Sequence, residues 1–208
     1  MSIYINKHLF KFKELLKNKY FWISVSVLVI GLLLNQFTSF YLNMKYDSLP
    51  VLNDLLLDNL PYFNLVKVYD FLSIISMCLF VLYVYKKEWK NLPFIILLFG
   101  ISQVTRGIFI GLTPFGSPKI DMVGLFNGTA FRSGVYPSGH TGSSFMAFLL
   151  SKGKMKYVFL TISISIMITL LLARGHYTID IFSAIIFNYA IYMFGNKYFK
   201  KKFKINKV

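Results

Sequence analysis

The sequence contains few of the residues that stabilise small secreted domains or build metal clusters. Its 208 residues include one cysteine, Cys78, so no disulfide can form within the chain, and only three histidines and eight acidic residues. Charged residues make up 15% of the chain and apolar residues 56%, with a mean hydropathy of +0.58. This composition excludes an ordinary soluble domain and predicts a membrane protein.

Apolar runs of about 20 residues, long enough to cross a bilayer core of about 30 Å, mark the candidate membrane spans. No small-residue cleavage site follows the first run, so we expect it to remain as an anchored helix. The sequence therefore predicts an all-α protein with six transmembrane helices in a single domain over 1–208, with a basic arm (1–19) and a basic tail (197–208). The six runs are 20–42, 68–85, 92–113, 139–151, which is short, 157–173 and 177–196.

The net charge of +15 is distributed in a way that indicates membrane topology rather than nucleic-acid binding. Lysines gather before the first span, between spans two and three, between spans four and five, and after the sixth. Because cytoplasmic loops carry an excess of basic residues, both termini are predicted to be cytoplasmic, with the lysines against an anionic inner leaflet. The clusters are Lys7, Lys11, Lys13, Lys17 and Lys19; Lys86, Lys87 and Lys90; Lys152, Lys154 and Lys156; and the lysines of 197–207.

All three arginines, Arg106, Arg132 and Arg174, fall on the opposite, extracytoplasmic side of this predicted topology. Arginine offers a rigid fork that matches phosphate oxygens, so their convergence predicts a bound phosphate group. Arg106 is the strongest candidate, since it interrupts the apolar run "FGISQVTRGIFIGLTPF", where a charge is costly. The alternative is that the three are scattered interfacial anchors.

A histidine and an aspartate stand four residues apart in "LLLARGHYTIDIFSAIIF", at the start of the sixth span. On a helix this spacing places His176 and Asp180 on one face, one turn apart. The aspartate can accept a ring N–H of the histidine, which fixes the tautomer and makes the other nitrogen a better base or nucleophile. The alternative is a structural polar pair that holds two spans together.

The stretch "YPSGHTGS" (136–143) begins the short fourth span. Pro137 and Ser138 suit the first turn of a helix, and Gly139 lets the backbone approach a ligand, so the N–H groups of this turn can cradle an anion. His140 stands beside the cradle and could protonate a leaving oxygen while His176 attacks phosphorus from the other side. A capping turn with an incidental histidine is the alternative.

Together these residues resemble the type 2 phosphatidic acid phosphatase superfamily, which consists of six-span enzymes with an extracytoplasmic site. The resemblance implies that His140 assists the leaving group, that His176 is the nucleophile and that Asp180 orients it, without a metal or other cofactor. A zinc site built from the same three residues is a further alternative, because their side chains are suitable ligands.

Four segments in chain order are similar to the motifs of the sphingomyelin synthase branch. They are "LPVLNDLLLDNLP" (49–61), "RGIFIGLTPF" (106–115), "SGHT" (138–141) and "HYTIDI" (176–181). In this resemblance Asp54, Asp58 and Thr113 are loop or entrance residues without an assigned role. As plain sequence, their region predicts a turn-rich extracellular connection with helix caps.

The chain departs from the phosphatases in two places that favour the synthase-like branch. The phosphatase arginine six residues before the nucleophile is replaced by Leu170, and Arg174 lies only two residues before it. The first phosphatase motif is also missing, since Arg106 is followed by Gly107 instead of proline and preceded by Phe99 instead of lysine.

The sequence thus predicts an integral membrane phosphoesterase or phosphotransferase that acts on a phospholipid head group through a phosphohistidine. A lipid alcohol is a possible acceptor, and no nucleic-acid partner is expected. Two alternatives stay open. One is a simple phosphatase acting on phosphatidate, phosphatidylglycerol phosphate or a polyprenyl diphosphate. The other is a non-catalytic lipid-binding or transport protein that keeps the site as a phosphate pocket.

Overall fold

The computed structural model of the chain describes residues 13–118 and 136–205, and its regular elements are helices. A helix occupies each of the six predicted span positions, with bounds that differ from the predicted ones by a few residues. This agrees with the predicted all-α fold. The elements are α2 (Lys19–Lys45), α3 (Leu55–Asn59), α4 (Val66–Tyr83), the short η1 (Val84–Glu88) and η2 (Trp89–Asn91), α5 (Leu92–Leu112), α6 (Gly139–Leu150), α7 (Lys154–Leu172) and α8 (Thr178–Tyr198).

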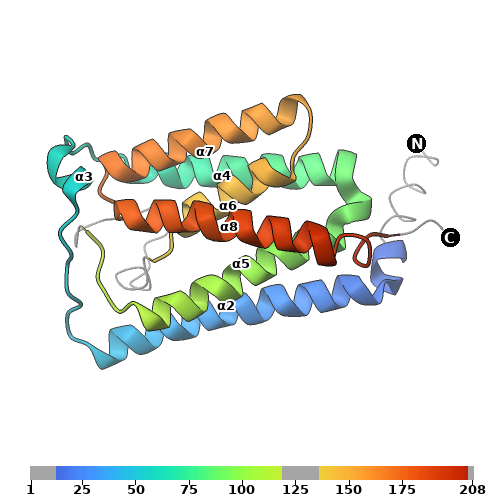
Figure 1. Cartoon of the computed structure of the whole chain (residues 1–208), viewed down its shortest axis with the longest axis horizontal. Helices are drawn as coiled ribbons and strands as arrows, with labels where there is room; N and C mark the ends of the chain where they lie inside the picture. The colour runs from blue at the N-terminus through green and yellow to red at the C-terminus, as the bar shows by residue number, and fades with distance from the viewer. Residues whose placement is uncertain (1–12, 119–135, 206–208) are drawn as a thin grey trace.

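Four segments of the described residues are long and apolar enough to cross a membrane. They are Lys19–Lys45, Val66–Leu112, Lys154–Leu172 and Thr178–Tyr198. The second has 47 residues and reverses direction at η1 and η2, so that α4 and α5 run in opposite directions (Figure 1). With 12 residues, α6 is shorter than the usual span. Six crossings and cytoplasmic termini therefore stay predictions.

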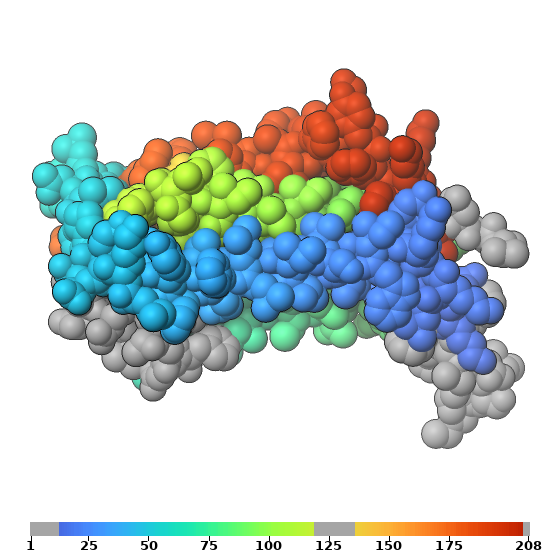
Figure 2. Space-filling view, turned by 90° about the horizontal axis from the view of Figure 1, so that it is seen from below, coloured from blue at the N-terminus to red at the C-terminus, as the bar shows by residue number. Residues whose placement is uncertain are grey.

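The helices form two groups. Helices α4, α6, α7 and α8 pack against one another, and α2 packs along α5, which in turn contacts α6 and α8 (Figure 1). Figure 2 shows α2 stretched along one face of the molecule beside α5. One apolar core, which includes Ile166, Leu170 and Ile181, joins α4, α7 and α8, and a second, with Phe80, Ile95 and Phe159, joins α4, α5, α6 and α7. Helix α5 thus links the two groups.

Glycines bring α2 and α5 into close contact. A Cβ atom added to Gly31 would lie 2.8 Å from Cβ of Gln103, and one added to Gly100 would lie 2.8 Å from the backbone nitrogen of Leu28. Neither neighbour is the far end of a flexible side chain, so a larger residue would push the helices apart. Close packing through small residues is typical of helix pairs in membranes.

The molecule is apolar on its outside and contains many polar side chains inside, as expected of a protein surrounded by lipid. Exposed apolar residues form outward stripes, and polar residues are buried between the helices. The stripes include Val29, Ile30, Leu33, Phe37 and Phe40 on α2 and Ile179, Phe182, Ile186, Tyr189 and Met193 on α8; the buried polar residues include Ser24, Asn35, Ser76, Ser144, Ser163, Asp180 and Asn188.

The lysine clusters of the described residues come together at one end of the bundle (Figure 1). There, Ile205 donates its backbone N–H to the carbonyl of Lys90, and Lys152 forms a 2.6 Å ion pair with Glu88. The ring of Tyr20, near the start of α2, lies 4.8 Å from that of Phe203 in the tail. The opposite end carries α3 and the turn between α7 and α8, and it holds the predicted site.

Candidate active site

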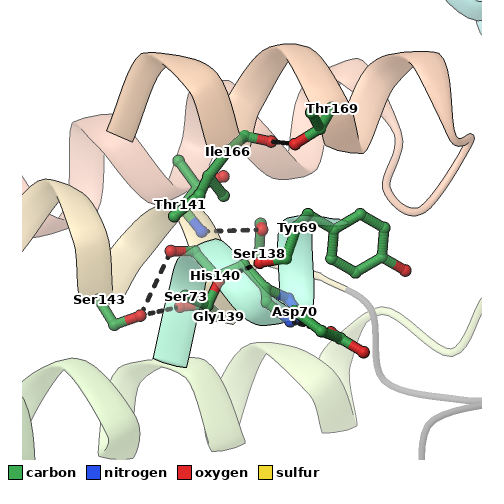
Figure 3. Close-up of polar contacts among 10 residues, drawn as sticks. All are labelled: Tyr69, Asp70, Ser73, Ser138, Gly139, His140, Thr141, Ser143, Ile166 and Thr169. Atoms are coloured by element: carbon green, nitrogen blue, oxygen red, sulfur yellow. Dashed lines mark hydrogen bonds and ion pairs between the residues drawn. The ribbon is translucent and has the colours of Figure 1, made fainter. Parts of the chain in front are cut away.

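The start of α6 forms the floor of the site. Ser138 is the N-cap, and its hydroxyl accepts the N–H of Thr141 at 3.3 Å (Figure 3). Its own N–H donates to the carbonyl of Asp180 at 3.1 Å. Pro137 therefore precedes the helix, instead of lying in its first turn as predicted. The remaining N–H groups of a first helical turn have no partner within the helix. The turn beginning at Gly139 can thus receive an anion.

The turn between α7 and α8 carries the second histidine. Nδ1 of His176 lies 3.0 Å from Oδ2 of Asp180, which also accepts the backbone N–H of Tyr177 at 3.0 Å. The pair is present, but the predicted helical spacing is wrong: Tyr177 is the N-cap of α8, so His176 lies before the helix and Asp180 in its first turn. An acidic residue at this position bonds back to the N-cap, and here it also holds the histidine.

The surroundings of His176 favour its neutral form. Its side chain is 7% exposed and that of Asp180 is fully buried. Burial lowers the pKa of His176, the Asp180 carboxylate raises it in part, and the charges of His140 and Arg106 lower it further. The net direction is downward. With Nδ1 directed at Asp180, Nε2 is the nitrogen that could attack an electrophile.

His140 faces the same space and has its own carboxylate partner. Its ring lies 6.0 Å from that of His176, centroid to centroid, and its Nε2 lies 3.1 Å from Oδ1 of Asp70 on α4 (Figure 3). Tyr69 packs edge-on against the same ring at 5.1 Å. Asp70 was not among the residues predicted from the sequence, although an acidic residue in an apolar span is a functional candidate by default. That signal alone would have identified it.

Arg106 connects α5 to the start of α6. Its Nε donates to the carbonyl of Pro137 at 3.0 Å, and its Nη1 donates to Oδ1 of Asn35 on α2 at 2.9 Å. A Cβ atom on Gly139 would lie 3.2 Å from Nε, so a larger residue there would press on the guanidinium. The structure thus brings Arg106, Ser138 and Gly139 together, as the phosphate prediction requires.

Arg174 differs from Arg106. Arg174 adopts a positive φ of 53° in the turn before α8, and its Nη2 lies 3.4 Å from the carbonyl of Leu57 in α3. The described hydrogen bond of Arg174 is therefore to α3, whereas Arg106 is bonded to the residue before the α6 cap. Arg132 lies outside the described residues. Phosphate binding by either stays a prediction.

The connection between α2 and α4 is hydrogen-bonded to the start of α8 through Asp54. Asp54 caps α3 by accepting from Leu56 and Leu57, and its other oxygen accepts the N–H of Thr178 at 2.6 Å. Burial alone would raise the pKa of Asp54, but these hydrogen bonds outweigh it and the pKa is lowered. This agrees with the cap expected there.

Asp58 lies in the first turn of α3, which is where a helix favours an acidic residue. Thr113 is the C-cap of α5, and its hydroxyl donates to the carbonyl of Phe109 at 2.5 Å. The position of Asp58 and the hydrogen bond of Thr113 each concern the residue's own helix, so they assign neither residue a role in the chemistry. Within the described part of the chain, no group of three or more His, Cys, Asp or Glu side chains is placed to hold a metal ion.

Two imidazoles, each paired with a carboxylate, lie close together beside a helix N-terminus that one arginine contacts, within a bundle of apolar helices. Residues 136–197 match the family described as "PAP2 superfamily C-terminal". The match contains His140, His176 and Asp180 and supports the PAP2 superfamily, a phosphatase-type group. It does not reach Arg106 or Asp70. A search among curated proteins finds no match to the chain.

Proposed function

We propose that the protein is a lipid phosphatase-type enzyme that works through a phosphohistidine on His176. The observation that carries the proposal is the 6.0 Å separation of two imidazole rings, His140 at the start of α6 and His176 before α8, the latter held by a buried aspartate 3.0 Å away. A phosphoryl group placed between the rings would have a nucleophile on one side and a proton donor on the other. In this proposal Arg106 and the α6 turn support its equatorial oxygens.

In the first step Nε2 of His176 attacks phosphorus, and the bond between phosphorus and the leaving oxygen breaks. His140 gives its proton to that oxygen, so the leaving group departs as a neutral alcohol. The imidazolium that forms on His176 is stabilised by Asp180, which keeps its hydrogen bond to Nδ1. The carboxylate of Asp70 is placed to accept from His140 and to orient its ring.

In the second step a hydroxyl group attacks the phosphohistidine. His140, now neutral, takes the proton of the attacking hydroxyl, and the N–P bond breaks to restore His176. Water as the attacking group gives hydrolysis, and a lipid alcohol gives head-group transfer. The similarity of 49–61 and 106–115 to the sphingomyelin synthase motifs supports transfer as the finer form of the proposal.

A membrane lipid is the proposed substrate. Helix α6 spans only about 18 Å at 1.5 Å per residue, so His140 is recessed from the end of the bundle if Lys152 lies at the opposite interface. A hollow of about 370 Å³ opens at the same end, between 52–55 and the start of α8, and its lining includes the exposed side chains of Leu55, Ile179 and Phe182. A lipid could approach the site from this side, at the extracytoplasmic leaflet.

Product analysis tests the proposal. Purified protein in detergent or vesicles is incubated with labelled phosphatidate, phosphatidylcholine, phosphatidylethanolamine and a polyprenyl diphosphate, with and without diacylglycerol or ceramide. Free phosphate indicates a phosphatase, a released phosphorylated head group indicates phospholipase C-like hydrolysis, and a new phospholipid indicates a transferase. Turnover should persist in EDTA and be inhibited by vanadate, which adopts the geometry of displacement at phosphorus.

The His176→Ala variant separates the enzyme from a lipid-binding or transport protein. An enzyme loses turnover completely, whereas a transporter keeps lipid binding and movement without the nucleophile. Equal lipid transfer between vesicles by the wild type and the variant, with no product from either, would overturn the proposal. Activity lost in EDTA and restored by zinc would replace it with a metal mechanism.

A further inference from the structure

A buried asparagine on the first helix contacts the arginine of the site. Asn35 is 5% exposed, although α2 is an apolar helix on the outer face of the molecule. Its Nδ2 donates to the carbonyl oxygens of Gly31 and Gln103, both at 2.8 Å, and to Oε1 of Gln103 at 3.0 Å. Its Oδ1 accepts from Nη1 of Arg106 at 2.9 Å. Both ends of the amide are therefore used, which removes most of the cost of burying it.

Glycine packing explains how an α2 side chain reaches the site. A Cβ atom on Gly107, the residue after Arg106, would lie 2.8 Å from Cγ of Leu34 and 3.1 Å from the backbone nitrogen of Asn35. Gly31, one turn earlier on α2, is equally close to Gln103. The two helices are in close contact where Asn35 and Arg106 meet, and the hydrogen bond between these residues depends on this contact.

Two acceptors, one on α2 and one just before α6, fix the plane of the Arg106 guanidinium. Asn35 of α2 holds Nη1, and the carbonyl of Pro137, at the entrance to α6, holds Nε. A planar group held at two of its nitrogens has a set orientation, and the value of arginine for phosphate binding lies in the orientation of its fork. One of the two acceptors belongs to a helix outside the segment 136–197.

We propose that Asn35 is a positioning residue, which holds Arg106 in the orientation that binds a phosphate group at the start of α6. The first helix then takes part in substrate binding and is more than a membrane anchor. This inference rests on the proposed function, because it requires that a phosphate group occupy the α6 turn. It assigns to Asn35 no contact with the substrate.

Asn188 on α8 offers a matched control. It is 4% exposed, its Nδ2 donates to the carbonyl of the residue four positions earlier, Ala184, at 2.8 Å, and its Oδ1 accepts from Ser102 of α5 at 2.8 Å. Asn35 has the same burial and the same kind of bonds, to its own helix and to α5. They differ in the donor to Oδ1, which is Arg106 for Asn35 and Ser102 for Asn188.

The experiment compares Asn35→Ala with Asn188→Ala in the intact membrane protein. Both should lower the melting temperature to a similar extent, since each removes a buried amide. Asn35→Ala should raise the KM for the phospholipid and the inhibition constant of vanadate about tenfold, and Asn188→Ala less than about twofold. In an Arg106→Lys background, Asn35→Ala should add less than about twofold, because the group that it positions is already replaced.

The outcomes separate this inference from the proposed function. If the wild type turns over lipid but the two alanine variants have the same KM and vanadate inhibition, Asn35 has only a structural role and the inference is wrong. If the wild type turns over none of the lipids, calorimetry with orthovanadate decides: weaker binding to Asn35→Ala than to Asn188→Ala retains the positioning role. A wild type that binds no vanadate overturns both.

Discussion

The site contains two histidine–aspartate pairs that differ in how far they are shielded from solvent. His176 and Asp180 lie 3.0 Å apart with side chains 7% and 0% exposed, while His140 and Asp70 lie 3.1 Å apart with side chains 33% and 11% exposed. The distances are nearly equal, so the environment distinguishes the pairs. An interaction in a water-poor site has a larger effect than the same interaction near solvent.

The two pairs also differ in how they are assembled. His176 and Asp180 come from one short stretch, and the N-cap of α8 fixes both at once, since Asp180 also accepts from Tyr177. His140 and Asp70 come from α6 and α4 and meet only through tertiary packing. The buried local pair suits a nucleophile, which must be neutral and fixed. The more exposed pair suits a group that exchanges a proton with an incoming alcohol or water.

The largest expected difference between the pairs concerns the histidines themselves. His176→Ala should abolish turnover of every substrate, because no nucleophile remains. His140→Ala should slow release of the first equivalent of leaving group about 10² to 10⁴-fold with an alkyl ester but far less with a nitrophenyl ester, which needs no protonation. His8→Ala, which changes the third histidine, is the control. Phosphohistidine trapped by alkaline quench should accumulate in His140→Ala and be missing in His176→Ala; the reverse result would exchange the two roles.

Substituting the two carboxylates should also lower turnover more in the His176 pair than in the His140 pair, with smaller losses than the histidine changes cause. Asp180→Asn should lower kcat about 10³ to 10⁴-fold, since a neutral amide does not stabilise the imidazolium. Asp70→Asn should cost about tenfold, because water can replace part of the interaction at the more exposed pair. Single-turnover rates on a nitrophenyl ester should be lowered only by the Asp180 change. Equal losses in the two variants would show that burial does not distinguish the pairs.

The contrast between a local and an assembled pair also explains what the sequence could predict. A spacing of four residues was enough to predict that His176 and Asp180 meet, although α8 begins after the histidine and the contact comes from capping instead of a helical face. The span positions were predicted from apolar runs, and each run corresponds to a single helix. Spacing and periodicity are local signals, and they succeeded where the structure is local.

These local signals could not predict which residues of different helices are in contact. Asp70 and His140 are 70 residues apart, and Asn35 and Arg106 are 71 apart. Each polar residue was visible within an apolar run, but which helix lies beside which depends on packing through residues such as Gly31 and Gly107. The number of crossings is a similar case, because the apolar run of α6 was predicted but its 12 residues are shorter than a usual membrane span.

The effect of the arginine should be smaller than that of the buried pair. Arg106→Lys keeps the charge but loses the fork, so kcat/KM should fall about 10²-fold. Lys152→Arg, which keeps its ion pair with Glu88 at the other end of the bundle, should change kcat/KM less than about twofold. Steady-state kinetics on one phospholipid measures both. Normal turnover and affinity in Arg106→Lys would show that the phosphate is held elsewhere.

The smallest expected effect is a shift in pH dependence. His176 lies in the turn before α8, and its pKa is lowered by burial, partly restored by Asp180 and lowered again by the charges of His140 and Arg106. The neutral ring is the nucleophile, so activity is retained as the pH falls below the ordinary histidine value of 6.5 and is lost only through the lowered pKa. The acid limb of kcat/KM for a nitrophenyl ester should therefore lie below pH 6.5.

His140→Ala removes one of the lowering charges and should move this limb to higher pH, whereas Arg106→Lys keeps its charge and should leave the limb in place. A limb above 6.5 in the wild type would show that the pKa of His176 is raised instead of lowered, and a limb that does not respond to His140→Ala would show that His140 does not influence that pKa.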